Sequence, residues 1–142
     1  MVISKETVLT RLQKLELSLA KLQELAKLTK KEFLNKENYV PRDLADRNLQ
    51  VAAECIFDIG GHIIVEDGLG IPNDYEDIIK ILGDNKVLSR RLAKQLKGLG
   101  GFRNLLVHDY MGIDYSLIYA RLKDGLGDFS DFIKEIHGYI SK

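Results

Sequence analysis

The sequence has little of what marks secreted, membrane-spanning or strongly charged proteins. It contains a single cysteine, Cys55, which excludes an internal disulfide and fits a reducing cytoplasm. No apolar run approaches the roughly twenty residues that a membrane span needs, and the N-terminus begins with a charged amphipathic pattern instead of a signal-peptide core. The 21 basic and 21 acidic residues cancel, so any attraction to nucleic acid must come from a local patch.

The sequence also lacks the common phosphate-binding motifs. Gly68-x-Gly70 follows a helical pattern instead of a strand, so it is not a dinucleotide fingerprint, and no Walker-type loop occurs. No strand-like alternation, internal repeat or low-complexity tract appears. The absence of strand-like alternation favours an all-helical chain.

What is present is a strong helical periodicity. With 142 residues, 45% of them apolar and 30% charged, the sequence predicts a single soluble domain over residues 1–142. We expect an all-α, antiparallel up-and-down bundle of four main helices plus one short helix. The predicted helices run from about Ser4 to Leu34, from Pro41 to about 63, from an Asp74 cap through Leu82, from about 84 to the 103–108 segment, and from an Asp114 cap to about 140.

Glycines interrupt several of these helices. Gly60-Gly61 in the second helix predicts a close approach of a neighbouring helix, because each glycine in a helix interior costs about 1 kcal/mol relative to alanine. Gly98, Gly100 and Gly101 precede Arg103 and predict a kink or a close backbone contact, and Gly125 and Gly127 predict a bend or a weak point in the last helix. Cys55 lies in an apolar helical run, which predicts core packing.

The segment 100–110 carries the strongest cluster of side chains capable of chemistry. His108 falls in the last turn of a predicted buried helix, where the helix dipole favours an imidazolium and the imidazole can exchange a proton near neutral pH. Asn104 lies one turn earlier on the same face. Arg103 is about 140° around the helix from His108, so the two converge only through the length of the arginine or an unwound helix end.

Two interpretations of Arg103 and His108 fit this spacing. In the first, the imidazole deprotonates a ribose 2′-OH and the guanidinium stabilises charge on the phosphate, which cleaves RNA without a metal. In the second, Arg103 is a salt-bridging surface residue and His108 only complements the helix dipole.

A polar line runs along the second predicted helix. Its acidic and histidine members fit a metal site, a polar lining of a cleft or dimer seam, or a solvated face, and the set lacks a second histidine or a cysteine. The cleft or seam interpretation involves Arg47, Glu54 and Asp58. The line comprises Asp43, Arg47, Gln50, Glu54, Asp58 and His62.

A basic stripe leads towards Arg103. Arg90, Lys94 and Lys97 share one face with Lys86, and no acidic residue occurs between positions 86 and 103. The stripe fits contacts to an RNA backbone. It equally fits a solvated cationic face that pairs with the acidic second helix or with an acidic partner.

Arg103, four further residues, His108, one more and then Tyr110 resemble the R-x4-H-x-Y motif of HepT-type toxins in the HEPN (higher eukaryote and prokaryote nucleotide-binding) superfamily. The resemblance extends through the Gly-Phe-Arg-Asn-Leu-Leu-Val-His-Asp-Tyr context to the length and helix order of nearly the whole chain. It implies a metal-independent endoribonuclease toxin, without a cofactor, whose active site is formed by Arg103 and His108. Asn104, on the His108 face of the same helix, is expected to orient groups around them.

The same resemblance implies particular partners. It implies a homodimer in which two motifs face a shared cleft, and a minimal nucleotidyltransferase antitoxin that transfers AMP to Tyr110, as in type VII-like toxin–antitoxin systems. The expected substrate is single-stranded or loop RNA. An alternative function is a non-catalytic dimeric module that binds nucleotide or a nucleotidyltransferase partner through Arg103, His108 and Tyr110.

Overall fold

The structure, a computed structural model, describes residues 2–108 and 112–142, and all regular secondary structure within these residues is helical. This confirms the predicted all-α class. The helices are α1 (Val2–Leu25), α2 (Lys30–Phe33), α3 (Val40–Glu66), α4 (Tyr75–Asp84), α5 (Arg90–Gln95), α6 (Leu99–His108), α7 (Tyr115–Asp124) and α8 (Leu126–Ile140).

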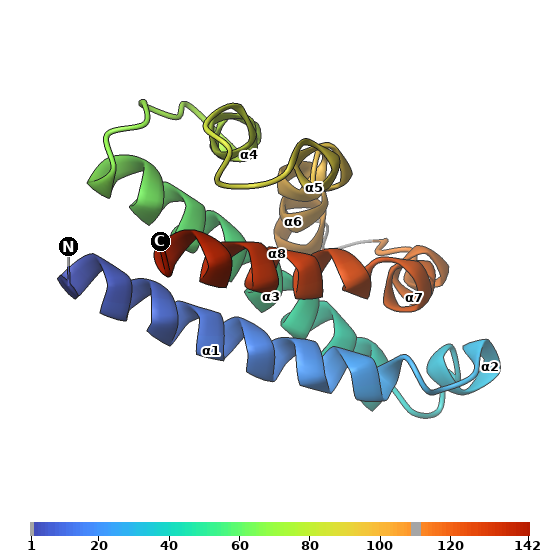
Figure 1. Cartoon of the computed structure of the whole chain (residues 1–142). Helices are drawn as coiled ribbons and strands as arrows, with labels where there is room; N and C mark the ends of the chain where they lie inside the picture. The colour runs from blue at the N-terminus through green and yellow to red at the C-terminus, as the bar shows by residue number, and fades with distance from the viewer. Residues whose placement is uncertain (1, 109–111) are drawn as a thin grey trace.

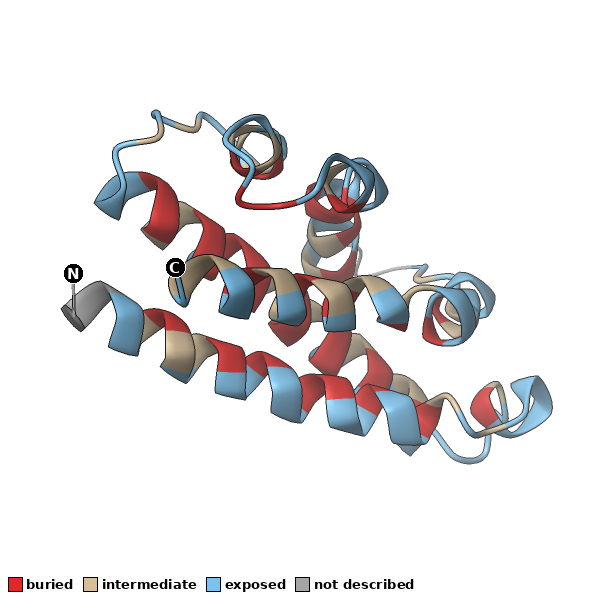
Figure 2. Ribbon diagram, viewed as in Figure 1, coloured by how far each residue is buried: buried red, intermediate tan, exposed pale blue. Residues whose placement is uncertain are grey.

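The three longest helices, α1, α3 and α8, form the body of the bundle. Figure 1 shows them lying lengthwise, with α8 over the space between α1 and α3 and the short helices α4, α5 and α7 running across them. Their buried faces point towards one another, and the outer face of α1 is exposed (Figure 2). One apolar core contains residues from all eight helices, including Leu15, Phe33, Ile56, Leu92 and Phe132. Cys55 is buried in it, as its apolar surroundings predicted.

The first predicted helix was too long. It ends at Leu25, and a separate short helix begins after Thr29, whose side chain and that of Glu32 form a reciprocal capping box. The carbonyls left open at this break accept hydrogen bonds from α7: Tyr119 donates to the Leu28 oxygen at 2.7 Å and Lys123 donates to the Ala26 oxygen.

The starts of α3, α4 and α7 agree with the predicted signals. Pro41 occupies the first turn of α3, and the side chains of Asp74 and Asp114 accept hydrogen bonds from the first turns of α4 and α7. The predicted close approach at Gly60 is also confirmed. A Cβ atom there would lie 2.7 Å from the Ile78 side chain, so α4 crosses α3 at this glycine.

Two other segments were predicted as single helices, and each is divided into two helices in the structure. The helix expected from about 84 to 108 is two helices, because Ser89 caps α5 and Gly98 takes a positive φ of 92° before α6. The backbone N–H of Gly98 donates to Glu76 of α4 at 2.9 Å, which anchors the break. The last predicted helix is divided into α7 and α8 at Gly125.

None of the helices within the described residues combines the length and the apolar composition that a membrane span requires.

Candidate active site

Helix α6 carries three of the four residues of the predicted catalytic segment. Leu99, Phe102 and Leu106 are buried and fix the rotation of the helix against the core. Arg103 therefore lies at the border of the core, while Asn104 and His108 are exposed. Tyr110, the predicted acceptor of AMP, lies outside the described residues.

Arg103 is held by polar contacts on both terminal nitrogens of its guanidinium. Nη2 donates to Oε1 of Glu54 on α3 at 3.1 Å, and Nη1 donates to Oδ1 of the adjacent Asn104 at 3.2 Å. The Arg103 side chain is 20% exposed, and that of Glu54 is 41% exposed. The contact is therefore a partly buried ion pair, and a fifth of the Arg103 side chain remains exposed.

The third neighbour of Arg103 is Tyr75, the first residue of α4. The guanidinium carbon lies 5.5 Å from the centre of the Tyr75 ring, and the Tyr75 ring also stacks on Phe57, with the ring centres 4.3 Å apart. Gly100 makes the approach possible, because a Cβ there would lie 2.7 Å from the Tyr75 Cβ. The sequence analysis did not select Tyr75, since only the packing of α4 on α6 brings it to the site.

Arg103 Nε is buried and has no hydrogen-bond partner in the part of the chain that the structure describes. A buried donor of this kind costs about 1–3 kcal/mol when it stays unpaired. Within the described residues, the guanidinium is therefore incompletely satisfied.

His108 ends α6, so its imidazole is near the negative end of the helix dipole. Because Arg103 and His108 lie on one continuous helix, the predicted separation of about 140° around the axis holds, with about 7.5 Å along it. Asn104 contacts Arg103 instead of the imidazole in the described residues. The structure thus brings Arg103, Asn104 and Glu54 together and leaves His108 on a different face of the same helix.

The polar line of α3 is divided among different partners. Glu54 binds Arg103 and also accepts a hydrogen bond from Gln50 at 3.4 Å. Asp58 instead pairs with Arg11 of α1 at 3.1 Å, and Arg47 is exposed. Among the described residues, no group of three or more histidine, cysteine, aspartate or glutamate side chains is placed to hold a metal ion. Glu54 and Asp58 thus face different helices, with Glu54 paired to α6 and Asp58 to α1.

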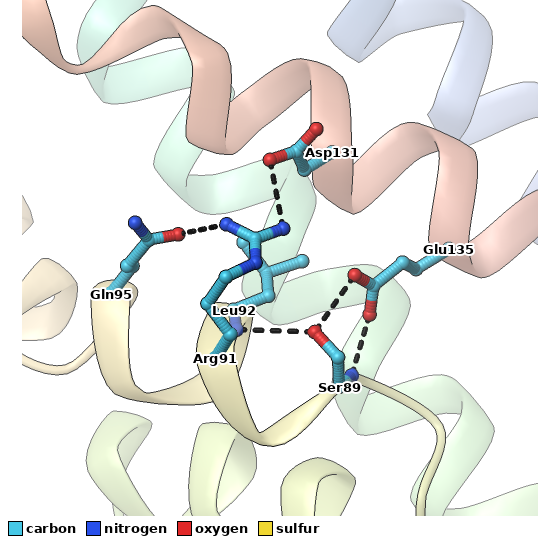
Figure 3. A network of polar contacts seen from close by, with 6 residues as sticks. All are labelled: Ser89, Arg91, Leu92, Gln95, Asp131 and Glu135. Carbon is cyan, nitrogen blue, oxygen red and sulfur yellow. Dashed lines mark hydrogen bonds and ion pairs between the residues drawn. The ribbon is translucent and has the colours of Figure 1, made fainter.

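One member of the basic segment is used to attach α5 to α8. Arg91 donates to Asp131 of α8 at 3.2 Å and to Gln95 at 2.6 Å (Figure 3). At the start of α5, the carboxylate of Glu135 accepts hydrogen bonds from the backbone N–H and the hydroxyl of Ser89 (Figure 3). These contacts fix the rotation of α5.

The three predicted RNA contacts lie outside this network. Arg90, Lys94 and Lys97 are exposed and form no salt bridge with any of the residues described. Among the described residues, their charges are therefore not paired with the acidic second helix, which leaves an RNA backbone, an acidic partner or a solvated face.

A helical bundle that holds an arginine in an ion pair and carries a histidine at the end of the same short helix fits the class of HEPN proteins. Comparison with known families makes the assignment specific: residues 15–136 match the family described as Ribonuclease HepT-like. The chain belongs to this family, and the predicted class of enzyme, an RNA endonuclease, is confirmed at the level of the family.

Individual proteins agree with this assignment. The chain is 33% identical over 101 residues to the mRNA nuclease HepT of Shewanella oneidensis, covering 71% of this chain and 76% of that protein. It is 27% identical over 133 residues to the tRNA nuclease HepT of Aphanizomenon flos-aquae, covering 92% and 88%. A solved structure of a tri-AMPylated Shewanella oneidensis HEPN toxin in complex with its MNT antitoxin superposes with a TM-score of 0.81, at 27% identity and 92% and 96% coverage.

Proposed function

We propose that this protein is a metal-independent endoribonuclease toxin in which Arg103 and His108 are the catalytic residues and Asn104 supports Arg103. The observation that carries the proposal is the partly exposed Arg103 guanidinium, held by Glu54 and Asn104 on the helix that ends at His108. Its cation is fixed in place before any substrate binds, and its open side is accessible to a phosphate.

The proposed reaction uses the ribose 2′-OH as nucleophile. One imidazole accepts the proton of the 2′-OH as its oxygen bonds to phosphorus, and the bond from phosphorus to the 5′-oxygen breaks as that oxygen takes a proton from a general acid. Arg103 neutralises the charge that develops on the non-bridging oxygens. The products are a 2′,3′-cyclic phosphate or its hydrolysis product and a 5′-OH.

The separation of Arg103 and His108 around α6 supports a homodimeric active site. A second copy places another Arg103 and another His108 at the same cleft, and one imidazole then acts as base while the other acts as acid. The exposed Asn104 and His108 are consistent with a surface that is completed by a partner. Arg47, Glu54 and Asp58 lie on the α3 face towards this cleft or seam in the proposal.

The antitoxin in this proposal is a minimal nucleotidyltransferase. The tri-AMPylated state and the MNT antitoxin of the Shewanella oneidensis complex support it. The hydroxyl of Tyr110 attacks the α-phosphorus of ATP, an ester bond to AMP forms, and pyrophosphate leaves. The added negative charge two residues from His108 then repels RNA.

In this proposal, exposed basic side chains on α5 and just after it bind the RNA backbone away from the scissile phosphate. Arg90, Lys94 and Lys97 form no ion pair in the described structure, and the attachment of α5 to α8 keeps Arg90 and Lys94 on a fixed helix. These contacts are sequence-independent, so they position RNA without selecting a sequence.

The test is RNA digestion in EDTA by purified wild-type protein and two histidine variants. His108→Ala is expected to abolish cleavage while circular dichroism and the melting temperature stay unchanged. His137→Ala is the matched control, because His137 is also exposed on a helix but pairs with Glu16 on another part of the surface. Equal cleavage by wild type and His108→Ala would reject the nuclease assignment and favour a non-catalytic binding module.

A further inference from the structure

We propose that Glu54 and Tyr75 are positioning residues for Arg103, Glu54 by holding one terminal nitrogen of the guanidinium and Tyr75 by supporting its face. The inference rests on the proposed nuclease function and adds to it one residue, Tyr75, that belongs to a different helix and to none of the predicted motifs.

Arg103 needs such support because of its flexibility. An arginine side chain loses up to about 2 kcal/mol of rotamer entropy when it is fixed. In this protein Glu54 lies on α3 and Tyr75 on α4, so two separate helices fix the guanidinium of α6 from different sides. The entropy loss then occurs on folding and not in the transition state, which is the condition for electrostatic preorganisation.

The count of donors leaves room for a phosphate. A guanidinium carries five N–H groups. Glu54 accepts from Nη2 and Asn104 accepts from Nη1, while Nε is buried. Within the described residues, one N–H therefore remains on each terminal nitrogen, and two such N–H groups can bind two oxygens of one phosphate.

Glu54 has two opposing effects that substitution separates. Its oxygen aligns Arg103, but its negative charge lies close to the position of the bound phosphate. Glu54→Gln keeps an acceptor oxygen of the same size and removes the charge, so we expect kcat within about threefold of wild type and an unchanged or lower KM. Glu54→Ala removes both, so we expect kcat to fall about tenfold or more.

Tyr75 offers a similar matched pair. Tyr75→Phe keeps the ring below the guanidinium, so kcat and KM are expected to stay at the wild-type values. Tyr75→Leu keeps an apolar side chain against Phe57 but removes the aromatic face, so we expect kcat to fall about two- to fivefold, the size of a cation–π contribution at a partly exposed site. If Tyr75 has a purely structural role, Tyr75→Leu lowers the melting temperature, but kcat does not differ between Tyr75→Phe and Tyr75→Leu.

A second measurement does not depend on cleavage. The exchange of the Arg103 Nε–H with water is followed by nitrogen-15 NMR of protein labelled at arginine, in the His108→Ala background, with Arg103→Lys to assign the signal. Because Nε is buried, exchange is expected to be slow in this background and in the Glu54→Gln and Tyr75→Phe variants, and at least about tenfold faster in Glu54→Ala and Tyr75→Leu.

The two measurements separate the two proposals. In one outcome, wild type cleaves RNA, and folded Glu54→Ala and Tyr75→Leu have the same kcat and the same rate of Nε–H exchange as their parent proteins. The positioning inference is then wrong and the nuclease proposal stands. If wild type does not cleave RNA but the exchange differences appear, the positioning of Arg103 stands and the nuclease proposal is wrong.

Discussion

Substituting the two adjacent glycines at the start of α6 tests how the helix approaches Tyr75. In Gly100→Ala the new Cβ would lie 2.7 Å from the Tyr75 Cβ and 3.4 Å from its Cδ2. The Tyr75 Cβ is fixed to its backbone and has no rotamer that avoids the contact, so α4 and α6 must move apart. In Gly101→Ala the new Cβ meets nothing within 4 Å, which makes it a control one residue away.

The comparison of the two variants isolates the steric cost. Both positions lie in the first turn of α6, so the gain in helix propensity from glycine to alanine, at most about 1 kcal/mol, is similar in each and cancels in the difference. What remains is overpacking at Gly100, which typically costs 1–3 kcal/mol. We therefore expect the free energy of unfolding of Gly100→Ala to be about 1–3 kcal/mol below that of Gly101→Ala.

Urea denaturation followed by circular dichroism measures this difference, with equal slopes expected for the two variants. The same displacement moves Tyr75 away from Arg103, so Gly100→Ala is also expected to accelerate exchange of the Arg103 Nε–H. If Gly100→Ala is as stable as Gly101→Ala, the close packing of α4 on α6 is wrong, and with it the support of Arg103 by Tyr75.

Tyr139 donates a short hydrogen bond to Asp67, which together with burial raises the pKa of the phenol to about 12. Because this pKa lies above the unfolded value of about 10, the hydrogen bond contributes to stability below pH 10, and this contribution is lost between pH 10 and 12. Tyr139→Phe is therefore expected to lower the free energy of unfolding by about 1 kcal/mol at pH 7 after solvent screening. In urea titrations, the variant is expected not to show the loss of stability that wild type shows between pH 10 and 12. Burial raises the pKa of the Cys55 thiol, so an aromatic disulfide reagent at pH 8 should modify it about a hundredfold more slowly in native than in denatured protein, and equal rates would contradict its place in the core. Removing the exposed Lys94 and Lys97 together should lower the salt-dependence slope of single-stranded RNA binding by about 1.4, whereas loss of two exposed lysines on α1 should not change it.

Apolar periodicity and caps predicted much of the bundle. The stripes of α1 and α3, the proline in the first turn of α3 and the aspartate caps of α4 and α7 are local signals, and each lies where it was predicted. The breaks were missed because apolar periodicity continues across them. Thr29 and Glu32 have the capping-box spacing that would have located the first break. The positive φ of Gly98 depends on its anchor to Glu76 on another helix.

The candidate site was predicted only in part for a related reason. Arg103 and His108 were found from their spacing and from a family motif, both of which are local in sequence. The sequence could not show which acidic residue of α3 pairs with Arg103. Glu54 and Asp58 share one face of the helix, and only the packing of the helices pairs Asp58 with α1 and Glu54 with Arg103. Tyr75 had no signal at all, since its role follows from the crossing of α4 and α6 at a glycine.

The chemical nature of the cleaved ends tests the central proposal most directly. A synthetic single-stranded RNA that wild-type protein cuts in EDTA is analysed by mass spectrometry, beside the same RNA with one 2′-deoxyribose at the cleaved position. The proposed mechanism predicts a 2′,3′-cyclic phosphate or 3′-phosphate and a 5′-OH, and no cut at the deoxy position. A 3′-OH with a 5′-phosphate, or an unchanged cut at the deoxy position, would contradict it.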